Sequence, residues 1–196
     1  MDKLLGELFL LLIFFAVEFG LLWYGFRAAK KSIEASNWPS VVGTITKMSL
    51  RENSDGDGTT YKVKVEYLYS VMDQTYTSSR LAFGYDWYSN NRRKHQNIFN
   101  KLEYVQSVKV RYNPQAPAIS TLSFGIHKSI RLMLFFAIGL PIIILTSQLS
   151  LIVKSDVTSF ISQLTFYSWI GILIWMLFQP DKVLLNNIEV VSYHQP

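Results

Sequence analysis

The sequence predicts an α+β membrane protein, in which a small antiparallel β barrel or sandwich lies between a first transmembrane helix and a two-helix transmembrane hairpin. Residues 61–71 alternate between apolar or aromatic and mostly polar side chains, and a period of two indicates a half-buried strand. Elsewhere, most apolar residues fall in three runs, and a helix of about 20 such residues crosses the hydrocarbon core of a membrane. The runs are Leu4–Phe26, Leu132–Val153 and Phe160–Phe178. They leave a polar domain at residues 37–123 and a short tail at residues 179–196.

The composition favours a membrane protein over a chain with one large soluble core. Of the 196 residues, 49% are hydrophobic and only 17% are charged, below the usual quarter for soluble proteins. The formal charge is +5, but several cations flank the apolar runs, where an anionic membrane surface is a more economical partner than nucleic acid. We therefore expect membrane lipid as a partner and no nucleic acid. The absence of cysteine excludes disulfides and thiolate catalysis.

The first apolar run has two interpretations, a transmembrane helix or a cleaved signal peptide. A signal peptide has a shorter apolar core and a small-residue cleavage site soon after it. This run is longer, and it ends in Trp23, Tyr24 and Arg27, which resemble an aromatic belt followed by a charged stop. An uncleaved helix is the prediction.

Glu18 lies inside this helix and is a possible functional or partner-contact residue. A charge near the centre of a bilayer is costly, so Glu18 should face other helices, be protonated, or lie near enough to the interface to be solvated. A hydrogen bond between helices is the simpler interpretation. The alternative is a proton or ion site, or a contact to a membrane partner.

Within the polar segment we expect four or five strands and one helix. The residue before Pro39 must be extended, which ends any helix at Trp38. A calcium loop at Asn53–Gly58 would need a glutamate where Lys64 stands, so a turn is favoured there. The basic cluster Arg92–His95 in the helix should be a solvated or headgroup-facing patch. The predicted elements are strands at Val41–Leu50, Thr60–Val71, Thr75–Arg80, Val108–Tyr112 and Ile119–Leu122, and a helix at Asn90–Leu102.

Several short motifs resemble a family of bacterial membrane proteins known as domain of unknown function 3592. The segment Trp38-Pro39-Ser40-Val41-Val42-Gly43-Thr44-Ile45 is similar to the family's opening motif, and the strand Tyr67-x-Tyr69-x-Val71 followed by Ser79-Arg80 is similar to a later one. Val108-x-Val110-x-Tyr112-Asn113-Pro114, followed by Ser120 and Leu122, completes the resemblance over Trp38 to Leu122. One position differs, since Val105 or Gln106 stands where a glycine is usual. The resemblance implies a β domain between transmembrane segments in the bacterial inner membrane, and it implies no reaction.

The motif residues have structural explanations. Gly43 suits a bulge or close packing in a strand, Asn113-Pro114 suits a turn, and a tyrosine such as Tyr112 can bury its ring while its hydroxyl stays hydrogen-bonded. The three histidines fall in three separate regions, and no serine, P-loop or dinucleotide motif indicates catalysis. We expect no enzyme activity, no metal and no cofactor.

Two functional hypotheses follow. In the first, the β domain is a protein-interaction or scaffold module, as in an accessory subunit or an immunity protein, because small β domains offer sheet edges to partners. In the second, an oligomer handles an ion or small molecule and uses Glu18, since three helices are too few for a usual transporter. A protein partner or a homo-oligomer is expected accordingly.

The basic residues that flank the apolar runs predict the orientation of the chain. Short cytoplasmic segments are enriched in Lys and Arg. The domain side carries six such residues against two, Lys3 and Lys154, on the other side. The β domain is therefore predicted to face the cytoplasm. The six are Arg27, Lys30, Lys31, Lys128, Arg131 and Lys182.

Overall fold

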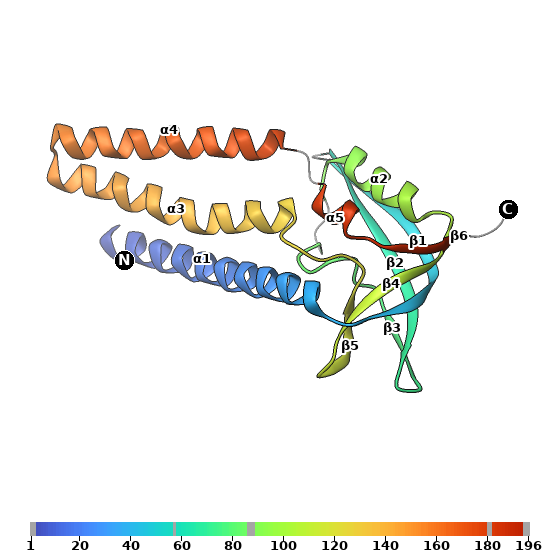
Figure 1. Ribbon diagram of the computed structural model, residues 1–196. Coiled ribbons are helices and arrows are strands. Elements are labelled where there is room, and N and C mark those ends of the chain that lie inside the picture. The colour runs from blue at the N-terminus through green and yellow to red at the C-terminus, as the bar shows by residue number, and fades with distance from the viewer. Residues whose placement is uncertain (1–2, 57, 86–88, 180–181, 194–196) are drawn as a thin grey trace. The chain divides into compact units, whose positions relative to one another are not determined.

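The computed structural model describes residues 3–56, 58–85, 89–179 and 182–193 (Figure 1). The chain forms two compact units, each described here by itself. One unit comprises residues 1–27 and 128–180, and the other comprises residues 28–127 and 181–196. The second unit therefore contains the predicted β domain together with the C-terminal segment.

Three long helices carry the predicted apolar runs. They are α1 (Lys3–Glu34), α3 (Lys128–Val153) and α4 (Asp156–Phe178). Among the described residues, three helices are long and apolar enough to cross a membrane. None of the described side chains of α4 is buried, and its exposed residues are largely apolar. Helix α1 also continues through residues 28–34, beyond the predicted apolar run Leu4–Phe26.

Helices α3 and α4 form an antiparallel hairpin that is packed through a glycine (Figure 1). A Cβ atom at Gly139 would lie 2.1 Å from Nε1 of Trp169, so the indole occupies the space that a side chain would need. The ring of Phe135 stacks on the same indole, with ring centroids 5.2 Å apart. At the open end of the hairpin, the Lys128 ammonium donates to the backbone carbonyls of Leu177 and Gln179. A cation at this position stabilises the C-terminus of α4.

The second unit is built on one antiparallel sheet. Its strand order is β3-β2-β1-β4-β5, and β6 pairs with β4. Helix α2 packs against β1 and β2, and its buried side chains Ile98 and Leu102 join the core. The elements are a 3-10 turn at Ala35–Asn37, β1 (Ser40–Asp55), β2 (Gly58–Val71), β3 (Gln74–Ser78), α2 (Arg92–Leu102), β4 (Val105–Asn113), β5 (Ala116–Thr121), α5 (Val183–Asn186) and β6 (Val190–Tyr193).

The predicted strand pattern is confirmed in β2. The inward side chains of its central and C-terminal part, at every second residue from Val63 to Val71, are at most 5% exposed, whereas Lys64 and Ser70 point outward. Strands β1 and β2 pair from Gly43 opposite Tyr69 to Asp55 opposite Gly58. The predicted loop at residues 53–58 is therefore mostly strand, with Asp57 outside the described residues.

A small barrel or sandwich was predicted, and the sheet is instead open, without closure into a barrel. In the described residues no backbone pairing joins β3 to β5, the two ends of the strand order. Both strands are short, and tyrosine side chains of β2 reach β5 in place of backbone pairing. The Tyr67 hydroxyl of β2 lies 3.1 Å from the Ser120 hydroxyl of β5, and the Tyr69 hydroxyl of β2 donates to the Pro117 carbonyl of β5 at 2.6 Å. The architecture is thus α+β with an open antiparallel sheet.

Candidate functional site

Gly43 lies where three strands approach closely. A Cβ atom at this position would lie 2.5 Å from Cγ2 of Val110 and 2.8 Å from the backbone oxygen of Leu68. Real Cβ atoms do not approach other atoms this closely, so the position requires glycine. Its role in the structure is close packing of β1 against β2 and β4.

The other motif residues shape the chain at the ends of strands. Trp38 has extended backbone angles, φ −71° and ψ 146°, as its position before proline predicts. Its ring meets Phe83 edge to face, with centroids 5.8 Å apart. The Pro39 carbonyl accepts from the backbone N–H of Tyr112, and the Asn113 side chain accepts from the N–H two residues later, which forms the turn after β4.

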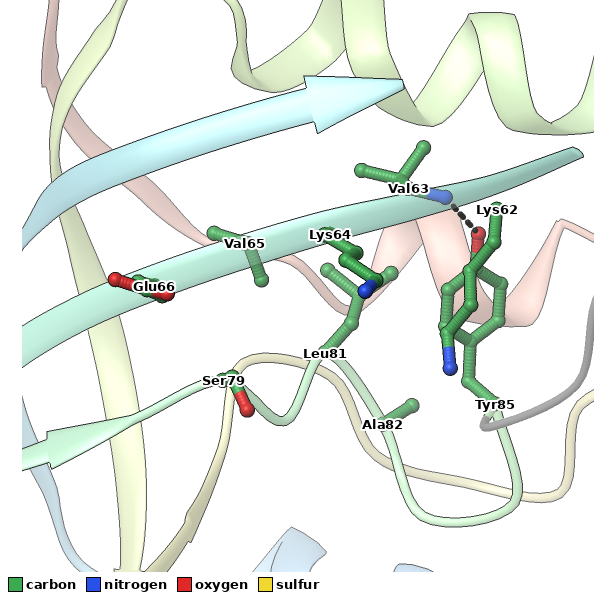
Figure 2. A pocket seen from close by; sticks show the side chains of 9 residues that line it. All are labelled: Lys62, Val63, Lys64, Val65, Glu66, Ser79, Leu81, Ala82 and Tyr85. Atoms are coloured by element: carbon green, nitrogen blue, oxygen red, sulfur yellow. Dashed lines mark hydrogen bonds between the residues drawn. The ribbon is translucent and has the colours of Figure 1, made fainter. Parts of the chain in front are cut away.

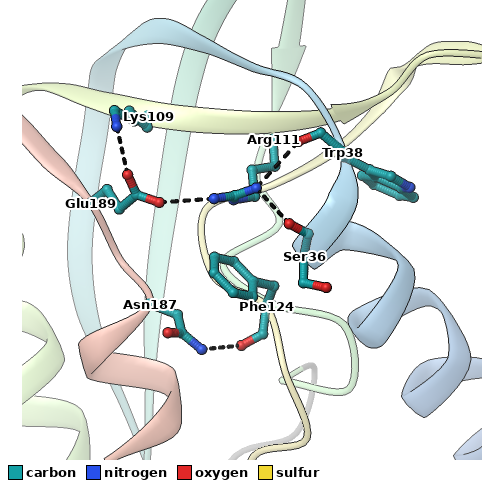
Figure 3. A network of polar contacts seen from close by, with 7 residues as sticks. All are labelled: Ser36, Trp38, Lys109, Arg111, Phe124, Asn187 and Glu189. Atoms are coloured by element: carbon teal, nitrogen blue, oxygen red, sulfur yellow. Dashed lines mark hydrogen bonds and ion pairs between the residues drawn. The ribbon is translucent and has the colours of Figure 1, made fainter.

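Arg111 is the centre of a polar network (Figure 3). Its guanidinium donates to the carbonyls of Ser36 and Trp38 at 2.8 and 3.2 Å, and to the Glu189 carboxylate at 3.0 Å. Lys109 donates to the other oxygen of the same carboxylate at 2.7 Å. The hydrogen bonds from Lys109 and Arg111 lower the pKa of Glu189. This network joins the start of β1 to β4 and to the C-terminal segment, which is a structural role.

The C-terminal segment, predicted as a short tail, is part of the domain. The Asn187 side chain donates to the carbonyl of Phe124, whose ring lies 4.3 Å below the guanidinium of Arg111 (Figure 3). The Lys101 ammonium donates to the carbonyl of Ile188 at 2.9 Å. Burial lowers the pKa of Lys101.

His95 is buried, which corrects the prediction that Arg92–His95 forms one solvated patch. Arg92 and Arg93 are exposed, but His95 is only 1% exposed because it lies on the inner face of α2. One ring nitrogen lies 2.6 Å from the Tyr85 hydroxyl and the other lies 2.7 Å from the Ser89 hydroxyl. Burial, and then the nearby charge of Lys94, lowers the pKa of His95 to about 4, so the ring is neutral at pH 7. The histidine ties the segment after β3 to α2.

A hollow of about 270 Å³ lies along one edge of β2 (Figure 2). Lys62 and Lys64 extend from the strand across this hollow, toward the segment that carries Leu81 and Ala82. Tyr85 closes one end, and its hydroxyl accepts from the backbone N–H of Val63 at 3.4 Å. Two lysines, Glu66 and Ser79 line the hollow together with apolar residues.

Glu18 lies on the inner side of α1 within the helical unit. Its side chain is 6% exposed, whereas the adjacent Val17 and Phe19 are 57% and 69% exposed. Its Oε2 atom has no hydrogen-bond partner among the described residues. A buried polar atom of this kind is costly in an apolar helix bundle, so the position is a candidate site as well as a structural feature.

The predicted membrane-flanking cations have several environments. Lys30 lies 3.9 Å from Glu34 in an exposed ion pair, and Lys31 lies over the Phe83 ring at 5.8 Å. Arg27 is exposed, whereas the Nε atom of Arg131 is buried with no hydrogen-bond partner among the described residues. In the described part of the chain, no group of three or more His, Asp or Glu side chains is placed to hold a metal ion.

Comparison with known families supports the motif analysis. Residues 41–127 match the family model described as a domain of unknown function, DUF3592. These residues are therefore similar to that family. The match confirms the resemblance drawn from the motifs between Trp38 and Leu122. No curated protein and no solved structure matches the chain.

The β domain contains two features that the sequence did not predict. The hydrogen bonds of His95 and the hollow beside β2 both depend on residues 79–85 and Ser89, in a part of the sequence without a repeating pattern. The outward Lys62 and Lys64 were visible in the alternation of β2, but the space beside them was not.

Proposed function

We propose that the protein is a non-enzymatic integral membrane protein whose β domain serves as a protein-interaction or scaffold module. The observation that carries the proposal is the open sheet, in which no described strand pairs with β2 along part of one edge. Unpaired strand edges are where extended segments of other proteins add to a sheet. An accessory subunit or an immunity protein would use the domain in this way.

We place the three apolar helices in the bacterial cytoplasmic membrane, with the domain in the cytoplasm. Their length, apolar surface and flanking cations support this placement, and the cations would contact lipid headgroups. Because the chain has no cysteine, Ser54→Cys introduces a single thiol at an exposed position of β1. An impermeant thiol reagent should label this variant only after cell lysis, and labelling of intact cells would contradict the orientation.

Affinity purification of the full chain from gently solubilised membranes tests the interaction role. A stoichiometric unrelated protein that remains bound through a second purification step is the expected result. A pure homo-oligomer would contradict it and favour the second candidate function.

The second candidate is an oligomer that handles an ion or small molecule through Glu18. The buried Oε2 atom without a hydrogen-bond partner favours it. Glu18→Gln separates the two functions, because it preserves size and hydrogen bonding but removes the ionisable group. In the interaction role the variant should retain its partner, whereas in the ion-handling role it should lose function.

A further inference from the structure

The outer face of the β1–β2 hairpin is rich in cations. Met48 and Leu50 of β1 and Val63 and Val65 of β2 belong to the core or pack against it. Because successive side chains of a strand point to opposite faces, the residues between and beside them point outward. The outward set is Lys47, Ser49 and Arg51 on β1, and Lys62, Lys64 and Glu66 on β2.

Two of these cations, Arg51 and Lys64, face no acidic residue. In the strand pairing, Arg51 lies opposite Lys62, and Lys64 lies opposite Ser49. Both Arg51 and Lys64 are exposed, and neither side chain forms an ion pair or a hydrogen bond within the described residues. Lys62 already has a contact of its own, so it is not part of the site. Arg51 and Lys64 are therefore accessible and uncompensated.

Both residues line a hollow of about 470 Å³ on this face, together with Ser49. Thr46 lines the hollow as well, and it lies at the register shift between β1 and β2. A bulge of this kind bends a strand, and the Thr46 hydroxyl holds the bend by donating to the Glu66 carbonyl at 3.2 Å. The two cations thus lie beside a recess and not on a flat surface.

The spacing of the two cations suits an extended chain. Arg51 and Lys64 are diagonal neighbours on one face of an antiparallel pair, about 7 Å apart. Side chains at positions i and i+2 of an extended segment are also about 7 Å apart. Two carboxylates at such positions could therefore reach one cation each, and a guanidinium accepts a carboxylate through two parallel hydrogen bonds.

The remaining lining of the hollow favours an acidic protein segment over nucleic acid. Glu66 lines it too, and its carboxylate, 3.2 Å from the Lys47 ammonium, interrupts the positive surface that a phosphate backbone would follow. Among the described residues that line the hollow there is no aromatic side chain on which a base could stack.

We propose that the outer face of the β1–β2 hairpin binds an extended acidic segment of a partner protein, with alternate carboxylates held by Arg51 and Lys64. The proposal rests on the proposed interaction function, because it names the chemistry of the contact by which the domain holds its partner.

Titration of the full chain in uncharged detergent micelles with matched peptides tests the site. The acidic peptide is Thr-Glu-Val-Glu-Thr, blocked at both ends, and its neutral counterpart is Thr-Gln-Val-Gln-Thr. With ¹⁵N-serine labelling, the Ser49 amide reports binding and the buried Ser120 amide reports the integrity of the domain. The acidic peptide should shift the Ser49 signal to saturation, and the neutral peptide should not. Arg51→Gln and Lys64→Gln should each weaken binding about fivefold, since each removes one exposed ion pair.

Arg93→Gln is the matched control, because Arg93 is exposed on α2 and does not line this hollow. It removes the same charge and should bind the acidic peptide as the native chain does. Equal binding of the neutral peptide, or native affinity in Arg51→Gln or Lys64→Gln, would overturn the proposal. Equal affinity for Thr-Val-Glu-Glu-Thr would overturn the match to alternate carboxylates, and tighter binding of single-stranded oligothymidylate would overturn the assignment to a protein segment. If a partner co-purifies as readily with the Arg51→Gln, Lys64→Gln double variant as with the native chain, the site fails while the interaction function stands.

Discussion

Replacing Gly43 by alanine should destabilise the β domain. The new carbon would lie 2.5 Å from Cγ2 of Val110 and 2.8 Å from the Leu68 carbonyl oxygen. The valine methyl can move only by disturbing the core, and the oxygen belongs to the backbone of β2, so neither contact relaxes cheaply. Overpacking of this kind costs about 2 kcal/mol, within the usual range of 1–3 kcal/mol.

Hydrogen exchange in detergent measures this cost without requiring the membrane helices to unfold. Where amides exchange through opening of the domain, a loss of about 2 kcal/mol makes exchange in β1, β2 and β4 about thirtyfold faster. Gly56→Ala is the matched control, because nothing lies within 4 Å of a Cβ atom at that position. Gly43→Ala combined with Val110→Ala should cost less than the sum of the two single changes, since one clash is removed. Native exchange rates in Gly43→Ala would refute the packing argument.

Three other changes have definite expected outcomes. The pKa of His95 is about 4 in the folded domain and 6.5 ordinarily, so its contribution to the stability of the domain is complete above pH 6.5 and falls as the pH decreases toward 4. The loss of stability approaches about 3 kcal/mol. Hydrogen exchange should report this fall in stability in the native chain, and the pH dependence of stability should largely disappear in His95→Gln. Gly139→Ala should lower the thermal midpoint of the solubilised chain by several degrees because its methyl group would overlap the indole that covers it, whereas Gly171→Ala, with nothing within 4 Å, should leave the midpoint unchanged. Tyr69→Phe removes the 2.6 Å hydrogen bond to Pro117 and should cost about 1 kcal/mol, seen as roughly fivefold faster exchange in β5, and unchanged exchange there would contradict a role in linking β2 to β5.

Local patterns were sufficient to predict the elements whose side chains repeat regularly. Strand β2 alternates without a bulge, so its buried face followed directly from the sequence. The extended conformation of Trp38 followed from the proline after it, and the need for glycine at position 43 followed from its place inside a strand. Each of these conclusions depends on residues close to one another in the chain.

Features that depend on contacts between residues far apart in the sequence were missed, because no local pattern specifies such contacts. The sequence places His95 beside three cations, and only the face of α2 that it occupies decides that it is buried. Closure of the barrel depended on whether β3 and β5 would pair, which no local pattern specifies. The structure instead links β2, the neighbour of β3, to β5 through the side chains of Tyr67 and Tyr69.

The C-terminal segment illustrates how the order of the chain limits such predictions. Strand β6 has only four residues, too few for alternation to distinguish it from a loop, and its partner residue Val108 lies far from Val190 in the sequence. Helices α3 and α4 come between the two strands, so β4 can gain this neighbour only after both helices have been synthesised. The Arg111–Glu189 contact depends on the same return of the chain. A domain completed by its last strand cannot be read from the motif-bearing segment alone, even though that segment contains most of its sheet.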